Sequence, residues 1–437
     1  MRVVVELRPS PELLSAAAGS AAGISATEMT GELPGFTLDA GFSPVSLPPG
    51  VRFSDTSQQS TESYLVRGEI PDGDQAARQA LAGAAGVTGI FADPVIEPVL
   101  TCGDDGVVGD WKKVAELLGR TELDAAGLTG EGVTVAVLDT GINAAKVREV
   151  SGATITIDAA RSWNPAGVSG KAGEFAVDHG TMCAFDAFIA APRSTFLDIP
   201  LLQSSRSGGS QMDGLLSDAL AAFAHLRTVL TDQPEDRRAL VISNSWGAFS
   251  PEWDFPVGDP GNYSDNPDHP FNVIVGSLDA AGADILFAAG NCGRDCPDGR
   301  CAYPERPITG ANSHPGALSV AGVDTGGQRV GYSSQGPGRL ADRKPDICSY
   351  THFLGSTAFG ADAPDTGTSA ACPVLAGVVA AFRTQWPATQ LPPARLRELL
   401  LKTAADRGGA GFDHDHGHGI VEPRALLAEL RKAAARA

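Results

Sequence analysis

The stretch Gly367-Thr368-Ser369-Ala370-Ala371-Cys372-Pro373 places a serine where a turn gives way to a helix. Residues 364–367 read Pro-Asp-Thr-Gly, which is turn chemistry, whereas residues 374–382 are all small or apolar. A helix without a polar face is a buried helix. Its N-terminus offers unpaired backbone N–H groups and the positive end of the helix dipole, which stabilise a negatively charged oxygen. We therefore interpret Ser369 as a nucleophile at the start of a buried helix, although a Gly-Thr-Ser triplet alone is also typical of a simple helix cap.

Three other polar residues stand at the ends of predicted buried elements. Asp139 follows the β-branched apolar run 133–138, and Asn291 follows the apolar run 285–289 after one glycine. His179 opens a second helix of small residues. Because ligand and catalytic groups favour the carboxyl ends of strands in open α/β sheets, this placement indicates an active site.

These residues, in the chain order Asp, His, Asn and Ser, resemble the subtilisin-like serine proteases, the subtilase family. The resemblance covers roughly residues 109–430. The motifs that carry it are Asp139-Thr140-Gly141, His179-Gly180-Thr181, Ser243-Asn244-Ser245-Trp246-Gly247, Ala288-Ala289-Gly290-Asn291, Tyr332-Ser333-Ser334-Gln335-Gly336-Pro337, Lys344-Pro345-Asp346 and the stretch around Ser369. The family implies an α/β fold with a doubly wound, mostly parallel sheet and helices on both faces.

The resemblance implies a serine endopeptidase that works through an acyl-enzyme. His179 would take the proton of the Ser369 hydroxyl and return it to the leaving amine, because a serine hydroxyl is a poor nucleophile at neutral pH. Asp139 would hold the imidazole tautomer. Asn291, with the backbone N–H of Ser369, would donate hydrogen bonds to the tetrahedral oxyanion. No cofactor is implied for this chemistry, and the sequence does not reveal whether a structural calcium ion is bound.

Two strand edges are expected to pair with an extended substrate. They comprise the substrate-binding residues Ser245, Trp246 and Gly247 on one edge and Ala288, Ala289 and Gly290 on the other. For Trp246, packing in the core is the alternative. By resemblance, the floor of the primary specificity pocket falls near residues 302–304, which contain no acidic residue, so we expect uncharged, medium-sized residues before the cut.

Periodicity fills in the peptidase domain, which we assign to residues 111–437. The helix 213–230 between the strands 195–201 and 240–243 is a crossover of the kind that builds a parallel sheet. The remaining expected elements are a helix over 111–118, a long surface loop over 249–272, and closing helices over 393–404 and 423–435.

The first hundred residues form a separate predicted domain. Their elements follow the order βαββαβ of a ferredoxin-like α+β domain, with strands over 1–8, 36–38, 64–69 and 87–98 and helices over 11–22 and 74–82. In the subtilase family a domain of this plan is an intramolecular chaperone and inhibitor. The alternative is an accessory domain that stays attached.

A Gly/Asp-rich linker over 101–110 joins the two domains. If the last N-terminal strand leads into the cleft, the uncut chain is self-inhibited. We expect the active protein to cut itself between Leu100 and Asp110 and the released domain to remain a tight inhibitor.

Two groups of residues depart from the family pattern. After His179-Gly180-Thr181 the family usually continues with a second histidine and a glycine; here Met182, Cys183 and Phe185 are hydrophobic changes that we expect to leave the triad intact. The other group is Cys292, Cys296 and Cys301, directly after Asn291.

Three interpretations of these cysteines remain open. Seven cysteines in the chain exclude a fully paired disulfide framework. A metal site would need His314 or water as a fourth ligand; a disulfide between two of the three, or free thiols, are the alternatives. The run 413–418, Asp-His-Asp-His-Gly-His, could be a ligand cluster, but the family places a turn there, and we assign no metal site.

Composition limits the partners. A net charge of −19 disfavours nucleic acid and anionic membranes. No run approaches the roughly 18 apolar residues of a membrane span. Glu6 and Arg8 interrupt the apolar stretch that a signal peptide would need, so we expect a cytoplasmic protein. The expected partners are therefore a peptide or protein substrate and the chain's own N-terminal domain.

Three rival functions use the same residues. Asp139-Thr140-Gly141 and Asp365-Thr366-Gly367 are the paired triplets of aspartic proteases, but a helix follows the second. Sedolisin-type peptidases share Gly-Thr-Ser, yet have Glu where His179 stands and Asp where Asn291 stands. An inactive peptide-binding relative is the third, and the presence of all four catalytic residues argues against it.

Overall fold

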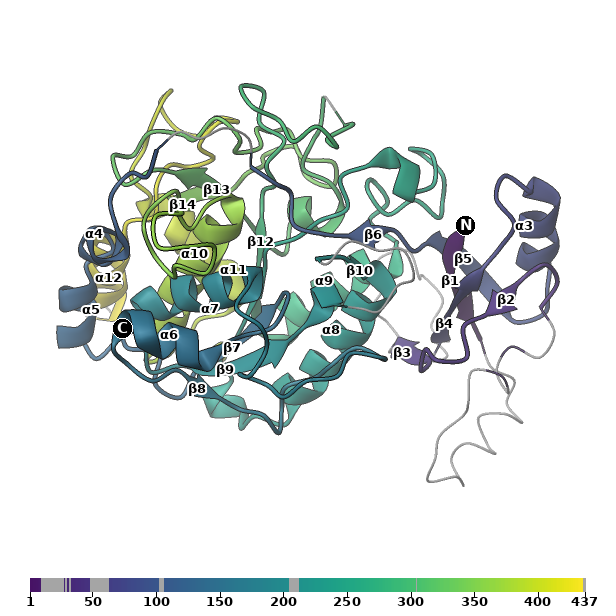
Figure 1. Cartoon of the computed structure of the whole chain (residues 1–437), viewed down its shortest axis with the longest axis horizontal. Helices are drawn as coiled ribbons and strands as arrows, with labels where there is room; N and C mark the ends of the chain where they lie inside the picture. Colours follow the sequence, from purple (N-terminus) through teal and green to yellow (C-terminus); the bar gives the residue numbers. More distant parts are fainter. Residues whose placement is uncertain are drawn as a thin grey trace.

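The computed structural model describes residues 1–8, 27, 30, 33–47, 63–101, 106–203, 212–303 and 305–434. Figure 1 shows a small part, formed by the first residues of the chain, beside a larger part built around one sheet. The helix predicted over 11–22 lies outside the described residues. Within these ranges no helix has both the length and the apolar character needed to cross a bilayer.

A parallel sheet forms the centre of the larger part. Among the described residues it has seven strands in the order β14-β13-β12-β11-β7-β9-β8, and all neighbouring pairs are parallel. The strands are β7 (Thr134–Leu138), β8 (Thr156–Ile157), β9 (Thr195–Ile199), β11 (Leu240–Asn244), β12 (Ala283–Ala288), β13 (Leu318–Val323) and β14 (Ile347–Tyr350). The strand order reverses between β7 and β11, where a crevice forms at the carboxyl ends of the strands. The predicted doubly wound α/β fold is confirmed.

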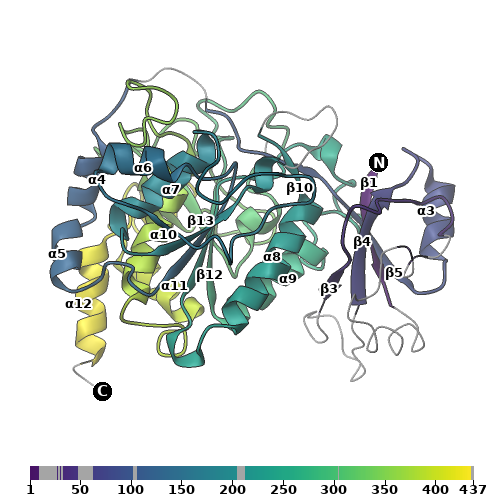
Figure 2. The same ribbon diagram turned by 60° about the horizontal axis from the view of Figure 1, so that its bottom comes forward.

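Helices cover both faces of this sheet. α7 (His179–Ala190) and α10 (Thr368–Arg383) share one apolar core with Val135 and Val137 of β7. α8 (Leu216–Thr231) and α9 (Pro270–Ala281) share the other core with the alternate residues Ala136 and Leu138. Figure 2 shows α8 and α9 side by side, next to the N-terminal part. The other helices of the larger part are α4 (Trp111–Leu117), α5 (Arg120–Ala125), α6 (Ala144–Ser151) and the two predicted closing helices, α11 (Pro393–Thr403) and α12 (Pro423–Ala434).

The N-terminal part is an antiparallel sheet with one described helix. Its strands are β1 (Arg2–Leu7), β2 (Thr37–Leu38), β3 (Val45–Leu47), β4 (Ser63–Glu69) and β5 (Val87–Ala92), and its helix is α3 (Gln75–Ala82). The order is β2-β4-β1-β5, with β3 also paired to β4. Val3 and Val5 pack in a core of this part with Leu81 of α3, whereas Val4 belongs to the core that contains α8. The ferredoxin-like plan stays a prediction, since its first helix lies outside the described residues.

The segment 249–272 is not the surface loop that we predicted. Tyr263 is fully buried, and the buried carboxylate of Asp254 accepts hydrogen bonds from the N–H groups of Phe255, Tyr263 and Ser264. Proline content correctly indicated the lack of long helices and strands here, but it carries no information on burial. A buried carboxylate organises this loop from within because it satisfies several backbone donors at once.

The described half of the predicted linker is also bonded to the larger part. Val108 N–H donates to the carbonyl of His352, and the backbones of Gly109 and Trp111 hydrogen-bond to Leu354. The prediction of a flexible link therefore does not hold for residues 106–110.

Candidate active site

The predicted carboxylate and imidazole meet at the end of β7. Asp139 follows β7 directly and is buried. His179 is the first residue of α7, where Asp178 caps the helix by accepting the His179 N–H. His179 Nδ1 lies 2.8 Å and 3.0 Å from the two Asp139 carboxylate oxygens. Burial alone would lower the pKa of His179, but the adjacent Asp139 carboxylate raises it above the ordinary value.

Ser369 lies in the first turn of α10, across the switch point from Asp139. Gly367, at the helix start, has a φ of 77°, and a Cβ there would lie 2.9 Å from Asn291 Nδ2, so both conformation and space call for glycine. Ser369 Oγ donates to the Ser245 carbonyl at 3.4 Å. Among the described residues it has no hydrogen bond to His179; such a bond is often loose until substrate reacts.

Asn291 is held so that its amide N–H₂ points into the crevice. Its Oδ1 accepts hydrogen bonds from Thr368 N at 2.9 Å and Thr368 Oγ1 at 3.0 Å. Sequence reasoning missed this role of Thr368, although the residue directly precedes Ser369. The orientation leaves Asn291 Nδ2 free to donate to the carbonyl of Val99 at 2.5 Å.

Cys183 contacts all three residues of the predicted triad, which we did not expect. Its Sγ lies 3.5 Å from Asp139 Oδ2, 3.7 Å from His179 Nδ1 and 3.5 Å from the Ser369 carbonyl oxygen. Residues four apart share one face of a helix, so the spacing from His179 was the available signal. The side chains of Asp139, His179 and Cys183 are also close enough together to hold a metal ion. Burial raises the Cys183 pKa well above its usual value, which keeps the thiol protonated.

A chain segment from the N-terminal part occupies the crevice. β6 (Val95–Ile96) pairs with β10 (Gly214–Leu215) in antiparallel fashion. On its other side Glu97 exchanges two backbone hydrogen bonds of 3.1 Å with Gly247. The next residues bring the Val99 carbonyl to Asn291. The segment is thus the middle strand of three, and its Val99–Leu100 peptide bond lies beside the start of α10.

The two predicted substrate edges differ in the structure. Gly247 pairs with the bound segment, but the Trp246 ring is buried between Phe271 and Phe287 and serves the core. The pairing predicted for residues 288–290 is not the one observed. Their backbone groups form hydrogen bonds within the larger part instead of with the bound segment. The Ala288 carbonyl accepts from the Asn312 side chain, Ala289 N–H donates to the Val320 carbonyl, Gly290 N–H donates to Thr368 Oγ1, and the Gly290 carbonyl accepts from Ser334 N–H.

Gly290 does not pair with the bound segment but lies beside its Val99 side chain. A Cβ on Gly290 would lie 4.0 Å from Val99 Cγ2. Tyr303, expected at the pocket floor, is buried and bonds to Ser264 through its hydroxyl at 3.1 Å; Pro304 lies outside the described residues.

The two cysteine- and histidine-rich runs are structural. Cys292 and Cys301 form a disulfide with each other, so the disulfide alternative is confirmed for this pair. Cys296 is also disulfide-bonded, so it is not a free thiol. His314 Nδ1 accepts a hydrogen bond from Gly316 N, and burial lowers the His314 pKa to about 4. In the run 413–418 the Asp413 carboxylate accepts from the N–H groups of Asp415 and His416, which forms the expected turn.

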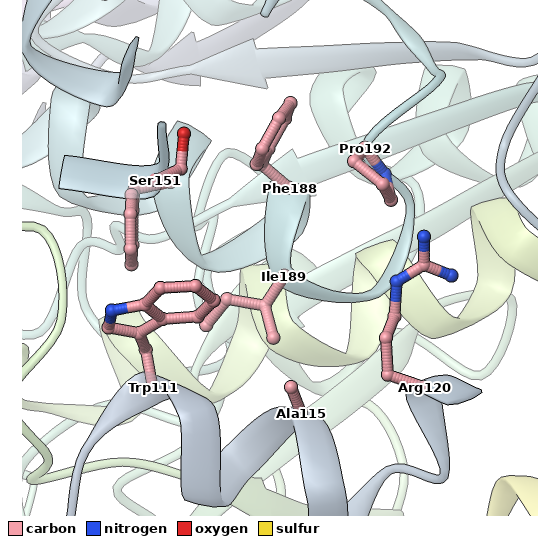
Figure 3. A pocket seen from close by; sticks show the side chains of 8 residues that line it. Trp111, Ala115, Arg120, Ser151, Phe188, Ile189 and Pro192 are labelled. Carbon is pink, nitrogen blue, oxygen red and sulfur yellow. The ribbon is translucent and has the colours of Figure 1, made fainter. Parts of the chain in front are cut away.

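A small hollow lies at the other end of α7, away from the predicted triad. Phe188, Ile189 and Pro192 from that end line a hollow of about 130 Å³ together with Trp111, Ala115 and Arg120. Figure 3 shows these side chains around it. Its lining is mainly apolar and holds none of the predicted catalytic residues. We therefore assign it to packing between α4 and α7.

Comparison with known proteins agrees with this site. The model of the subtilase family, peptidase S8, matches residues 130–419. Fervidolysin of Fervidobacterium pennivorans is 28% identical over 209 residues, which are 44% of this chain and 26% of that protein. Mycosin-1 of Mycobacterium tuberculosis is 27% identical over 329 residues, which are 68% of this chain and 69% of mycosin-1.

A solved structure supports the fold. The crystal structure of fervidolysin, described as a keratinolytic enzyme related to subtilisin, matches with a TM-score of 0.58 and 18% identity, and covers 98% of this chain and 60% of that chain. This chain therefore spans about a quarter of the fervidolysin sequence and 60% of its solved chain. Because the family model covers well over half of the residues, the chain belongs to the subtilase family.

Proposed function

We propose that the chain is a serine endopeptidase with the triad Asp139, His179 and Ser369. The observation that carries this proposal is the bound segment: a peptide carbonyl, that of Val99, accepts a hydrogen bond from Asn291 Nδ2 beside the start of α10. A donor at that position stabilises the negative charge that develops on the carbonyl oxygen during attack.

The reaction follows from the groups present and calls for no cofactor. His179 accepts the Ser369 proton while Oγ bonds to the carbonyl carbon, and the carbonyl electron pair moves to the oxygen held by Asn291. The oxyanion collapses, the C–N bond breaks, and His179 donates its proton to the leaving amine. Water then repeats the sequence on the acyl-enzyme, which releases the acid and restores Ser369. Asp139 orients His179 and stabilises the imidazolium.

The N-terminal part is proposed to be the chaperone and inhibitor of the peptidase. In the bound register the bond presented for cleavage is Val99–Leu100, one residue before the window of 100–110 that we predicted. Val99 is an uncharged, medium-sized residue, as expected for the position before the cut. Tethering raises the local concentration of this segment to roughly the millimolar range, so the uncut chain inhibits itself.

Contacts outside the crevice support retention of the N-terminal part after the cut. Arg67 forms a buried ion pair with Asp218 on α8 at 2.7 Å. Arg78 binds Asp259 through two hydrogen bonds of 2.7 Å and 2.6 Å. These contacts do not depend on the Val99–Leu100 bond, so the fragment would stay docked as a slowly released inhibitor.

N-terminal sequencing of the purified chain tests both proposals. Wild type should yield a new N-terminus at Leu100, whereas Ser369→Ala should remain full length. Ser277→Ala, on α9, is a matched control that should be cut like wild type. An uncut wild type that hydrolyses peptides at full rate would make the N-terminal part an accessory domain; an uncut wild type without activity would contradict the proposed self-cleavage.

The cytoplasmic location stays a prediction. The Cys292–Cys301 disulfide weighs against it, because structural disulfides persist mainly in oxidising compartments.

A further inference from the structure

We propose that Arg300, in the loop closed by the Cys292–Cys301 disulfide, selects an acidic side chain at the third residue before the cut. The inference rests on the proposed function, because it treats the bound segment as a substrate. In that register Glu97 is the third residue before the Val99–Leu100 bond. In the structure, the Glu97 side chain forms an ion pair with Arg300 of this loop.

Arg300 contacts both a side chain and the backbone of the bound segment. Its Nη1 lies 2.6 Å from Glu97 Oε1, and its Nη2 donates to the Pro98 carbonyl at 3.4 Å. The guanidinium is itself oriented by Asp298, with Nη2 to Oδ2 at 2.7 Å and Nε to Oδ1 at 3.1 Å. A planar guanidinium held on one side in this way presents its remaining N–H groups in a fixed direction.

An aromatic ring, a backbone hydrogen bond and a disulfide hold Arg300 and its loop in place. The guanidinium carbon lies 4.9 Å from the centre of the Phe249 ring, within the range of a cation–π interaction. The backbone N–H of Asp298 donates to the Asn291 carbonyl at 3.1 Å, and the disulfide joins the residues on either side of the loop. The loop is therefore anchored to the oxyanion donor.

The same loop also contacts the residue after the cut. Asp298 Oδ2 accepts the backbone N–H of Leu100 at 2.9 Å. One short loop thus engages the bound chain on both sides of the bond that would be broken. Because the same loop holds both sides of the bond, binding of the Glu97 side chain also helps to place the Val99–Leu100 bond against Ser369.

Burial makes the charge of the third residue important. Glu97 is 7% exposed, and the Asp298 side chain is 6% exposed. Burial raises the pKa of Glu97, Arg300 counteracts this, and the carboxylates of Asp213 and Asp298 add to the rise. Arg300 is therefore the cation that compensates a buried carboxylate here. A lysine at this position would bring a second cation to Arg300, whereas a glutamine would lose only the charge.

The kinetics of peptide cleavage test the proposal. The substrate is a quenched peptide with residues 94–101, Pro-Val-Ile-Glu-Pro-Val-Leu-Thr, and its versions with Gln or Lys in place of Glu. The full chain is used after self-processing, at a concentration set by active-site titration. For wild type we expect kcat/KM to be about 10-fold or more higher for the Glu than for the Lys peptide, with the Gln peptide between them and the difference mainly in KM.

Variants separate this selection from general damage. Arg300→Met should cleave the three peptides at rates within about threefold of each other, and Arg300→Glu should prefer the Lys peptide. Arg306→Met removes an arginine paired with Asp342 in the same region, and should keep the wild-type preference. Equal cleavage of Glu and Lys peptides by wild type, or an unchanged preference in Arg300→Met, would overturn the proposal. Failure of the proposed function differs from both, since no peptide would then be cleaved in a Ser369-dependent way.

Discussion

Two triplets with the same sequence, Asp139-Thr140-Gly141 and Asp365-Thr366-Gly367, have different chemical surroundings. Both aspartates are 1% exposed. Asp139 meets an imidazole, that of His179, at 2.8 Å. Asp365 instead accepts hydrogen bonds from the N–H and hydroxyl of Ser356 at 2.5 Å and 2.6 Å. A triplet alone therefore does not identify a catalytic carboxylate; the partner that tertiary structure supplies does.

The difference extends to protonation. Burial raises the pKa of Asp365 to about 6, although its hydrogen bonds to Ser356 oppose the rise. Asp186, on α7, is also buried, and burial together with the proximity of Asp365 raises its pKa well above the usual range. The second triplet thus belongs to a pair of neighbouring carboxyl groups, which readily hold a proton between them. The aspartic-protease reading fails, since Asp139 and Asp365 have separate partners.

The largest expected effect comes from the partners of the first triplet. Ser369→Ala and His179→Ala should each lower turnover by about 10⁶, and the double variant should be hardly slower, because the three groups act as a unit. Turnover of the quenched peptide by titrated enzyme measures this. Losses that multiply in the double variant would contradict the assignment of the triad.

A direct comparison of the two aspartates should give the next largest effect. Asp139→Asn should lower turnover by about 10⁴, because an amide favours the wrong imidazole tautomer. Asp365→Asn should have a far smaller effect, since it removes no group that contacts His179 Nδ1. Thermal unfolding of both variants serves as the control for folding. Similar losses of turnover in the two variants would contradict the assignment of Asp139, rather than Asp365, as the carboxylate that orients His179.

The oxyanion donor should account for a smaller effect. Asn291→Ala should lower turnover by about 10²–10³, the usual result of losing one such donor. Thr368→Val removes the hydroxyl that holds Asn291 Oδ1 and keeps the backbone N–H, so we expect about a tenfold loss. Unchanged KM values in both variants would place the effect in the transition state. A Thr368→Val loss greater than that of Asn291→Ala would indicate another role for Thr368.

The smallest expected effect is a shift in pH dependence. His179 must be neutral to accept the Ser369 proton, so kcat/KM should fall as pH decreases through the raised pKa of His179. The Asp365 carboxylate contributes to that rise, so Asp365→Asn should move the inflection to lower pH. Asp342→Asn, at an exposed position, is the control. An inflection that moves upward in Asp365→Asn would show that Asp365 does not act on His179 through its charge.

Much of the site could be predicted because its groups are set by local sequence. The apolar run before Asp139 and the small-residue run after Ser369 have lengths and compositions that only a buried strand and a buried helix accommodate. Their ends are therefore visible in the sequence, and so is the residue at each end that we propose as catalytic. The same local logic failed at 249–272, because the burial of Asp254 depends on partners that proline content does not reveal.

The sequence by itself determined which residues we propose as catalytic and on which elements they stand, because strand and helix periodicity is a property of neighbouring residues. Only the tertiary structure decided what meets across the crevice: Cys183 against the triad, Thr368 against Asn291, β10 as the second edge, and Arg300 against Glu97. These contacts join residues far apart in the chain or depend on side-chain direction. Their formation depends on how separate elements pack, which no single stretch of sequence specifies.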